Sequence, residues 1–258
     1  MTHLTAIGSG KGGTGKTLIA VSLAHALAHQ GERVLLCDAD LGLSNAGVHL
    51  GVSDTGDLAG LLAGRKTLKD ATARVACGPR DGFDILAAPS GSGALADASE
   101  AIIDRLLAAL EGAPYDRVLI DLGAGVDETV MRIAGHADDI LLVVTPDPAS
   151  LTDAYAFAKL LLRRTTTRVP YLLVNMALNA TEGRRTAEAL IASARAFLRA
   201  TPEYLGYVPC DSRVPDAVRR QTPLLAAYPQ TPAAVAIEAI ALKLHGAPAR
   251  PLATAGLR

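Results

Sequence analysis

The amino-acid sequence predicts an α/β fold in which helices flank a mostly parallel central sheet. Its short apolar runs are uninterrupted rather than alternating, as expected for strands that are covered on both faces. Longer segments with helical spacing of apolar residues lie between these runs. Because strand and helix alternate along the chain, a sheet between two helical layers is the economical interpretation. A ligand of such a sheet is expected beyond the carboxyl ends of its strands.

The individual elements follow in chain order. Strands are predicted at 3–8, 33–37, 84–87, 117–120, 139–144, 170–174 and 204–208, and helices at 16–30, 99–111, 150–164, 183–200 and 232–245. No internal repeat and no linker-like break interrupts this series, so we expect one domain over residues 1–245. Residues 246–258 are rich in glycine, alanine and proline and are expected to form a flexible tail.

The charge balance argues against a strong general attraction to nucleic acid or anionic lipid. Lysine and arginine number 25 against 26 for aspartate and glutamate, a formal net charge of -1, so any such contact must be local. Aromatic residues make up 3% of the chain, which argues against stacking platforms for single-stranded nucleic acid. Without a secretory signal or an apolar run approaching the roughly 20 residues of a membrane span, a cytoplasmic protein is expected.

Cysteine and histidine give no sign of a metal centre. Cys37, Cys77 and Cys210 are far apart and are expected to be reduced packing residues. Of the six histidines, only His25 and His29 have metal-ligand spacing, and they lack a carboxylate companion of the HExxH kind. We therefore expect both at the surface of the first helix.

A glycine-rich loop carries the strongest functional signal. The pattern G-x-x-x-x-G-K-[ST] is satisfied, between the first predicted strand and the first predicted helix, by Gly10, Lys11, Gly12, Gly13, Thr14, Gly15, Lys16 and Thr17. Glycines let successive backbone N–H groups turn toward one anion, and the helix N-terminus adds partial positive charge. Lys16 is expected to reach the β- and γ-phosphates of ATP, and the Thr17 hydroxyl to bind Mg²⁺. The alternative is a glycine-rich turn that only links two elements.

A second lysine, Lys11, lies inside the same loop. The loop resembles the deviant Walker A sequence KGGxGKT of the MinD and ParA ATPases, which have a three-layer P-loop NTPase fold of the SIMIBI class. The resemblance implies that Lys11 reaches the phosphates bound by the other subunit, so that ATP favours a homodimer. It also implies that Lys11, Lys16 and Asp40 support a slow hydrolysis of ATP. The alternative for Lys11 is a solvated loop charge.

Three aspartates are predicted at the phosphate crevice. Asp38 and Asp40 follow the run 33–37 and, two apart on an extended chain, face the same side, while Asp121 follows the run 117–120. Mg²⁺ requires oxygen ligands beyond a hydroxyl, and a hydrolytic water requires an acceptor. The family resemblance assigns Asp38 and Asp121 to the Mg²⁺ site and Asp40 to the attacking water. It also implies that the N–H of Gly125 senses the γ-phosphate.

Four further residues are placed near the nucleotide by the resemblance. Asn45 would touch the attacking water or the γ-phosphate, and a plain turn or cap asparagine is the alternative. Asn175 follows the predicted strand 170–174, and Pro209 and Asp211 follow the strand 204–208. The resemblance implies that these three residues surround the adenine and the ribose of ATP.

The resemblance extends from about Leu4 to His245 and is greatest to the FlhG (FleN, YlxH) group of flagellar number and placement regulators. It rests on the stretches DADLGLSNAGVHLGV, ILAAPSGSGALAD, TPDPASLTDAYAF and YLGYVPCDSRVPDAVRRQTPLLAAYP. It implies protein partners, among them the flagellar assembly GTPase FlhF and flagellar switch or regulatory proteins. A cytoplasmic protein with a peripheral or polar position is implied as well.

Some features depart from the family pattern. Gly47 stands where an aspartate is usual and Leu122 where a small hydroxyl residue is usual, so the switch segments are expected to differ. Family members often carry an N-terminal extension that engages FlhF, whereas the first strand is predicted almost at Met1, so stimulation of FlhF is not expected from this sequence. The apolar residues of the last helix are expected in the core, so membrane association should be weak or absent. These residues are Val235, Ile237, Ile240 and Leu244.

Other function classes stay open at this point. A ParA-type partition or cargo-positioning ATPase would bind nonspecific DNA when it holds ATP, through the arginine pairs at 163–164, 184–185 and 219–220. A ligase or an iron–sulfur reductase component could use the same fold, although the reductase requires cysteines near residues 123–131, where the sequence has none. A protein that holds nucleotide and never hydrolyses it is a further alternative.

Overall fold

A computed structural model of the chain describes residues 2–40, 45–78, 81–88, 99–165 and 168–245. Its eight-stranded sheet has the order β3-β4-β2-β5-β1-β6-β7-β8. The strands are β1 (His3–Gly8), β2 (Val34–Ala39), β3 (Ala73–Ala76), β4 (Gly82–Leu86), β5 (Arg117–Leu122), β6 (Asp139–Val144), β7 (Tyr171–Ala177) and β8 (Glu203–Pro209). All strand pairs are parallel except β3 with β4. The predicted α/β fold with a mostly parallel sheet is confirmed.

The central strands consist of continuous apolar runs because both of their faces are covered. Every residue of β2, β5 and β6 is buried. The edge strand β3 was not predicted, because it is short and only Val75 among its residues is buried.

Four strands run past their predicted ends. Asp38, Asp121, Asn175 and Pro209 therefore lie inside β2, β5, β7 and β8 rather than after them. The parallel ladder continues through these polar residues, and Asp38 is the register partner of Asp121. The strands continue through these polar residues because their backbone groups still pair with the neighbouring strand.

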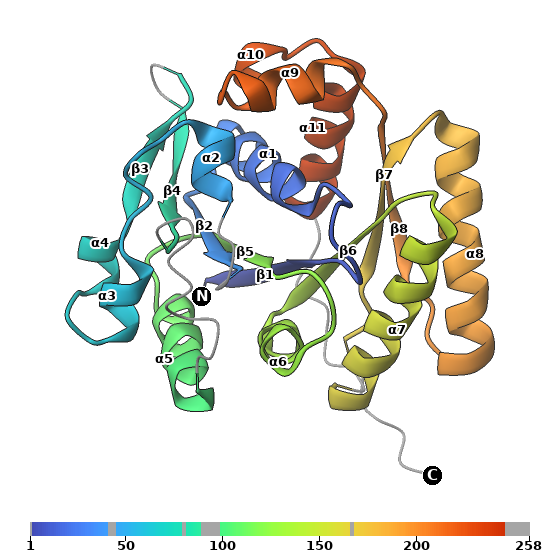
Figure 1. Ribbon diagram of the computed structural model, residues 1–258, viewed down its shortest axis with the longest axis horizontal. Helices are drawn as coiled ribbons and strands as arrows, with labels where there is room; N and C mark the ends of the chain where they lie inside the picture. The colour runs from blue at the N-terminus through green and yellow to red at the C-terminus, as the bar shows by residue number, and fades with distance from the viewer. Residues whose placement is uncertain (1, 41–44, 79–80, 89–98, 166–167, 246–258) are drawn as a thin grey trace.

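Helices cover both faces of the sheet (Figure 1). The longer helices are α1 (Lys16–His29), α5 (Glu100–Glu111), α6 (Glu128–His136), α7 (Pro148–Arg164), α8 (Ala180–Leu198) and α11 (Pro232–His245). The shorter ones are α2 (Ala46–Leu50), α3 (Leu58–Leu62), α4 (Leu68–Ala71), α9 (Arg213–Arg219) and α10 (Leu224–Ala227). In Figure 1, α1, α2, α9, α10 and α11 lie above the sheet and α5, α6 and α7 lie below it.

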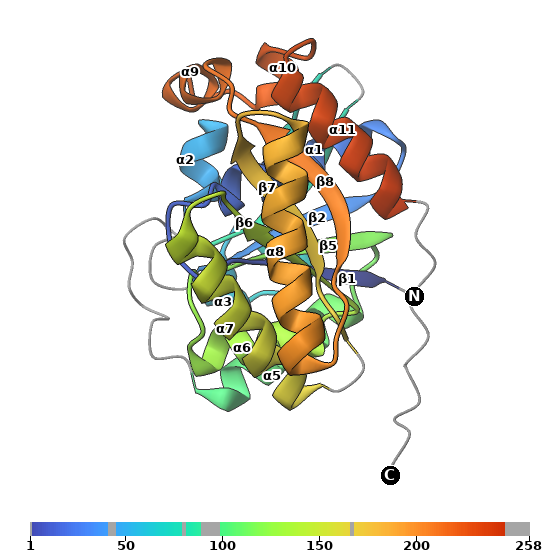
Figure 2. The same ribbon diagram turned by 90° about the vertical axis from the view of Figure 1, so that its right-hand side faces the viewer.

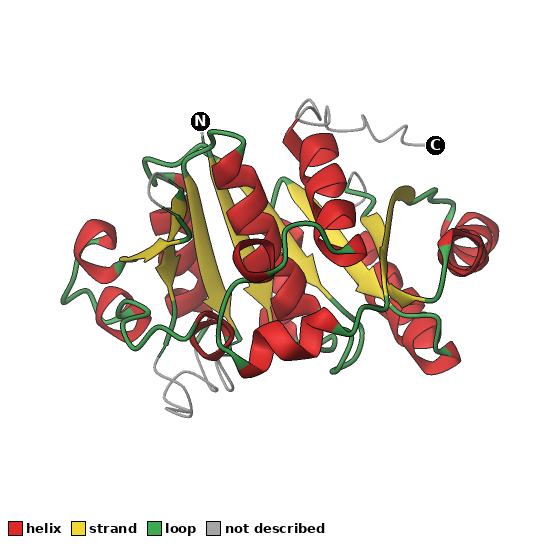
Figure 3. Ribbon diagram, turned by 90° about the horizontal axis from the view of Figure 1, so that it is seen from above, coloured by secondary structure: helices red, strands yellow, loops and turns green. Residues whose placement is uncertain are grey.

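Each helical layer encloses its own apolar core. Ile7, Ile19 and Ile237 belong to the core beneath α1 and α11, whereas Ile103 and Phe157 belong to the core on the other face. Figure 3 shows the strands beneath the helices of the first layer, seen from above. Figure 2 shows α7 and α8 side by side over the β7 and β8 end of the sheet. The sheet is therefore buried from both sides, as the uninterrupted strands require.

Side-chain caps decide where α7 and α8 begin. The Asp147 side chain accepts a hydrogen bond from Ala149 N, and the Asn179 side chain accepts one from Glu182 N. Such caps satisfy backbone N–H groups that the first turn leaves without partners. Both helices consequently begin two to three residues before the predicted positions 150 and 183.

Three expectations about individual residues are wrong. His25 is buried, with 6% of its surface exposed, because α1 packs between the sheet and α11. Val235 is 52% exposed, since it lies on the outer face of α11. Cys210 is exposed, whereas Cys37 is buried.

Two further expectations concern the tail and the membrane. The expected tail at 246–258 lies outside the described residues. Within the part of the chain that the structure describes, no helix combines the length and apolarity that crossing a bilayer requires.

Candidate functional site

The loop between β1 and α1 has a backbone conformation that glycine adopts easily. Gly13 and Gly15 have φ values of 79° and 80°, in the left-handed region. A Cβ at Gly15 would lie 2.4 Å from Asn175 Nδ2, and a Cβ at Gly10 would lie 2.2 Å from the backbone of α7. A Cβ at Gly12 or Gly13 would meet nothing within 4 Å. The loop is therefore fixed from beneath and open in front, as an anion-binding loop requires.

Lys16 forms a buried ion pair at the start of α1. Its Nζ donates a hydrogen bond of 2.6 Å to Asp121 Oδ1 on β5. The two side chains are 8% and 1% exposed. Burial raises the pKa of Asp121 to about 6, an effect that Lys16 partly offsets and Asp38 reinforces. At neutral pH, which is above this pKa, the Asp121 carboxylate accepts the Lys16 hydrogen bond in a desolvated position.

Lys11 forms a second ion pair at the outer edge of the loop. Its Nζ donates a hydrogen bond of 2.5 Å to Asp147 Oδ2, at the N-cap of α7. These side chains are 36% and 45% exposed. The hydrogen bond from Lys11 lowers the pKa of Asp147 below its ordinary value. The signature lysine is thus bound within its own subunit, by a residue to which the sequence pattern did not point.

Asp38 anchors the segment that precedes α2. Its Oδ1 accepts a hydrogen bond from Asp40 N, and its Oδ2 accepts hydrogen bonds from Asn45 N and Ala46 N, each at 3.0 Å. Asp40 faces the segment after β5, because a Cβ at Gly123 would lie 3.9 Å from Asp40 Oδ1. Asp38 therefore acts structurally in addition to its predicted role near Mg²⁺.

Two predicted nucleotide contacts are made to the protein's own backbone instead. Gly125 N donates a hydrogen bond of 3.0 Å to the carbonyl of Ser9. Asn175 Nδ2 donates a hydrogen bond of 2.8 Å to the carbonyl of Thr14 and so supports the loop from β7. The predicted contacts of Gly125 with the γ-phosphate and of Asn175 with the adenine stay predictions.

Pro209 and Asp211 lie at the end of β8. Pro209 is the register partner of Ala177. Asp211 accepts hydrogen bonds from Arg213 N at 2.9 Å and from Ala233 N, in the first turn of α11, at 3.2 Å. Their predicted place around the adenine and the ribose stays a prediction as well.

A cleft of about 420 Å³ lies over the loop, within the usual size range of ligand sites. It is lined by Ser9, Lys11, Gly12, Gly13, Thr14, Gly15, Lys16, Thr17, Leu18, Asp40, Asn45, His49 and Ala124. The structure therefore brings Lys11 to Thr17 together with Asp40 and Asn45, as predicted.

Sequence reasoning missed several residues of this region. Ser9, Leu18 and Ala124 adjoin motifs, and proximity in the chain could have indicated them. His49 and Asp147 come close only because α2 and α7 pack against the loop. No sequence signal pointed to these two side chains.

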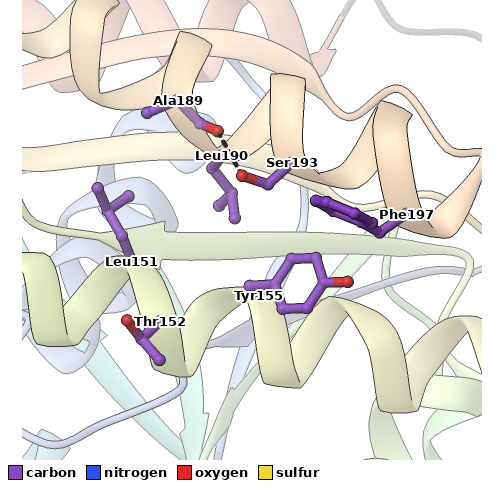
Figure 4. A pocket seen from close by; sticks show the side chains of 7 residues that line it. All are labelled: Leu151, Thr152, Tyr155, Ala189, Leu190, Ser193 and Phe197. Carbon is purple, nitrogen blue, oxygen red and sulfur yellow. Dashed lines mark hydrogen bonds between the residues drawn. The ribbon is translucent and has the colours of Figure 1, made fainter.

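A second hollow of about 500 Å³ lies between α7 and α8 (Figure 4). It is lined by Leu151, Thr152, Tyr155, Ala189, Leu190, Ser193 and Phe197. None of these side chains carries a charge, and the Ser193 hydroxyl donates to the carbonyl of Ala189 in its own helix. The hollow therefore lacks the groups that bind phosphate.

The donor set beneath the cleft fits a magnesium ion bound together with a nucleotide. Asp121 Oδ2 is buried and has no hydrogen-bond partner among the described residues, although buried polar atoms are normally paired. The described residues contain no cluster of three or more histidine, cysteine or acidic side chains that could hold a metal. Mg²⁺ typically takes few protein ligands and completes its shell with water and phosphate oxygens. Thr17, Asp38 and Asp121 are the residues that would support it.

Comparisons with known proteins agree with this site. The chain matches the CobQ/CobB/MinD/ParA nucleotide binding domain over residues 5–224. It is 37% identical over 248 residues to the antiactivator FleN of Pseudomonas aeruginosa, covering 95% of this chain and 87% of FleN. It is 32% identical over 228 residues to the flagellum site-determining protein YlxH of Helicobacter pylori, covering 85% of this chain and 74% of YlxH.

Solved structures show the same architecture. The septum site-determining protein MinD with Mg-ADP from Pyrococcus horikoshii has a TM-score of 0.79 at 25% identity, with 95% of this chain and 97% of that chain covered. A chain of the MinC:MinD cell division protein complex of Aquifex aeolicus has a TM-score of 0.77 at 27% identity, with 97% and 98% covered. The resemblance inferred from the loop and the P-loop fold that it implied are confirmed. The chain belongs to the CobQ/CobB/MinD/ParA nucleotide-binding family.

Proposed function

We propose that this protein is an ATP-dependent dimerisation switch that hydrolyses ATP slowly and regulates the position or number of flagella. The placement of two lysines in one loop carries the proposal. The Lys16 side chain is 8% exposed and the Lys11 side chain is 36% exposed. One nucleotide is held by the inner lysine, so the outer lysine is available to the phosphates of a second subunit.

Lys16 binds the β- and γ-phosphates of ATP in its own subunit. It lies at the N-terminus of α1, where the helix dipole and the loop N–H groups add to its charge. Phosphate oxygens draw Lys16 from Asp121, whose carboxylate is then available on the metal side of the cleft. Mg²⁺, supported by Thr17, Asp38 and Asp121, would neutralise phosphate charge.

Lys11 must leave Asp147 before it reaches another subunit. Both side chains are substantially exposed, and exposed ion pairs contribute little to stability. Exchanging Asp147 for a phosphate therefore costs little. Because phosphates of the second subunit complete this contact, ATP links occupancy of the cleft to dimer formation.

Asp40 is the residue that orients the attacking water. It lines the cleft and faces Gly123 in the segment after β5. The described residues that line the cleft include no arginine. An arginine at this position accelerates hydrolysis in many nucleotide hydrolases, so slow turnover is expected here.

The flagellar role is supported by the relatives. FleN is an antiactivator and YlxH a flagellum site-determining protein. Another relative forms a complex with a protein partner, MinC. We accordingly propose that the ATP-bound dimer recruits a flagellar protein, of which the GTPase FlhF is the first to test. A pull-down with the Asp40→Ala variant and ATP should retain that partner, and the same experiment with ADP should not.

Light scattering in the presence of ATP and Mg²⁺ tests the switch. The Asp40→Ala variant should remain a dimer, wild type should return to monomer as ATP is consumed, and Lys11→Ala should dimerise more weakly than wild type. Persistent monomers of both wild type and Asp40→Ala would refute the switch. Phosphate release over hours separates a slow ATPase from a protein that only binds nucleotide.

DNA binding of the ParA type is the second candidate, and the arginine pairs give it limited support. Arg164 is paired with Glu128, and Arg219 and Arg220 are both paired with Asp216. These guanidinium groups are partly neutralised by their partners. An ATP-dependent shift of nonspecific DNA that weakens steeply with salt would favour this candidate, and no shift at low salt would remove it.

A further inference from the structure

We propose that His49 donates a hydrogen bond to the phosphates of the bound nucleotide and thereby couples helix α2 to nucleotide occupancy. The inference rests on the proposed function, because it takes the cleft over the loop to be the ATP site. His49 lies outside the phosphate-loop pattern, which spans residues 10–17.

The position of His49 supplies the first argument. It lies in α2 (Ala46–Leu50), and its side chain lines the cleft together with the phosphate loop, Asp40 and Asn45. Helix α2 packs against α1, the helix that begins in the loop. His49 is therefore the histidine that the fold places at the phosphate site.

The state of the imidazole ring supplies the second argument. His49 is half-buried, and its Nδ1 is buried without a hydrogen-bond partner among the described residues. Burial lowers the pKa of His49, and the charge of Asp38 partly opposes this effect. The ring is thus neutral at pH 7, with one N–H donor and one acceptor. A leucine would fill the same space without burying a polar atom, so packing alone does not explain the imidazole.

The other cations of the cleft supply the third argument. Lys16 is bound by Asp121 and Lys11 by Asp147. A phosphate must displace a carboxylate to reach either lysine. For His49 the structure shows no such competitor among the described residues. Because Nδ1 is inaccessible, the ring nitrogen that would donate to an entering phosphate is Nε2, with Nδ1 as the buried acceptor of the neutral ring.

The attachment of α2 supplies the coupling. Asn45 N and Ala46 N, at the start of the helix, donate to Asp38 Oδ2. Asp38 belongs to β2 and is the register partner of Asp121. A contact from His49 to phosphate therefore fixes the second end of a short helix whose first end is already fixed to the sheet. Nucleotide binding should order α2 through this contact.

The test compares four proteins by titration with fluorescent mant-AMP-PNP and mant-ADP in the presence of Mg²⁺. They are wild type, His49→Leu, His49→Gln and the control His29→Leu, which changes an exposed histidine at the far end of α1. His49→Leu should weaken binding about tenfold, the size of one charge-assisted hydrogen bond. His49→Gln should stay within about threefold of wild type, because its amide keeps a donor, and His29→Leu should match wild type.

Two further measurements separate a phosphate contact from a packing role. Nucleotide should shift the ring nitrogen resonances of His49 and leave those of His29 in place. Hydrogen exchange at 46–50 should slow on nucleotide binding in wild type and in His49→Gln, but not in His49→Leu.

The outcomes distinguish this inference from the proposed function. If wild type binds no nucleotide, the proposed function fails. If wild type binds nucleotide and His49→Leu binds equally well, only the role of His49 is overturned. Equal weakening by leucine and glutamine, with unshifted ring resonances in wild type, would also overturn it.

Discussion

Lys16 and Lys11 belong to one loop, but they occupy opposite electrostatic environments. Lys16 and its partner Asp121 are 8% and 1% exposed, whereas Lys11 and its partner Asp147 are 36% and 45% exposed. Both bonds are short, at 2.6 Å and 2.5 Å. Distance therefore does not distinguish the pairs. Burial does, because a desolvated charge needs a partner at all times while an exposed charge exchanges its partner for water at little cost.

The two carboxyl groups show the same contrast in their pKa values. Burial raises the pKa of Asp121 to about 6 despite its bond to Lys16. The hydrogen bond from Lys11 lowers the pKa of Asp147. In the proposed function, Lys16 exchanges Asp121 for phosphate inside the cleft, whereas the exposed Lys11 can leave Asp147 for water or for the phosphates of a second subunit.

The largest expected effect follows from removing the inner lysine. Lys16→Ala should weaken ATP binding about 1,000-fold, roughly 4 kcal/mol, because it removes one member of a buried charge cluster. Titration with mant-ATP measures the change. Lys159→Ala, an exposed lysine of α7, is the matched control and should bind as wild type does. Binding within tenfold of wild type would show that the loop backbone, rather than Lys16, holds the phosphates.

The second-largest expected effect is a dependence of the free energy of unfolding on pH, caused by the buried Asp121 carboxyl. Since the pKa of Asp121 is about 6 when folded and about 3.8 ordinarily, the folded protein holds this proton more tightly than the unfolded chain. The resulting stabilisation, about 3 kcal/mol, is fully present below pH 3.8 and is lost as pH rises through 6.

Urea unfolding of the protein without nucleotide and Mg²⁺, measured between pH 4 and 7, tests this dependence. Asp121→Asn should lack the decline that wild type shows. The hydrogen bond from Arg33 lowers the pKa of the exposed Asp116 to about 2. Folded Asp116 therefore titrates below this pH range and does not mask the effect of Asp121. A flat profile for wild type would mean that the Asp121 carboxyl is better solvated than its burial indicates.

The outer lysine should matter for association and hardly for binding. Lys11→Ala should bind mant-ATP within about threefold of wild type, while its ATP-dependent dimer should weaken about 30-fold, roughly 2 kcal/mol, as expected when one partner of an interfacial charge pair is removed. Sedimentation at several protein concentrations, in AMP-PNP and Mg²⁺, gives the dimer dissociation constant. Equal losses of binding and association would place Lys11 on its own subunit's nucleotide and remove the distinction between the two lysines.

The surroundings of Lys16, namely the phosphate loop and the aspartates beside it, could be predicted from the sequence. The loop pattern is local, and the left-handed φ values of Gly13 and Gly15 explain why glycine stands there. Asp38 and Asp121 follow apolar runs, so parallel strands were expected to bring them to one edge of the sheet, and their register pairing agrees. The alternation of strands and helices likewise predicted the helical layers that cover both faces of the sheet.

The surroundings of Lys11, and other features that depend on packing, could not be predicted in the same way. Asp147 meets Lys11 only because α7 begins beside the loop, and the two residues are 136 positions apart. His49 reaches the cleft because α2 packs on α1. Strand β3 was missed because a half-exposed edge strand shows no continuous apolar run. Each of these features depends on how helices and edges pack, which periodicity along the chain does not specify.

The smallest expected effect concerns the residue that holds Lys11. Asp147→Asn removes the carboxylate charge but keeps a side chain that caps α7, since asparagine is a good N-cap residue. The melting temperature should therefore change by less than about 2 °C. The dimer in AMP-PNP should become about two- to threefold tighter, because Lys11 no longer has to leave a partner in the monomer.

Asp104→Asn gives the matched control for this variant, because it disrupts an exposed ion pair with Arg132 that lies outside the loop. It should leave the dimer unchanged. A dimer weakened tenfold by Asp147→Asn would contradict the interpretation of Asp147 as a holder of Lys11 in the monomer. It would mean that the Asp147 carboxylate contributes to the dimer itself rather than holding Lys11 in the monomer.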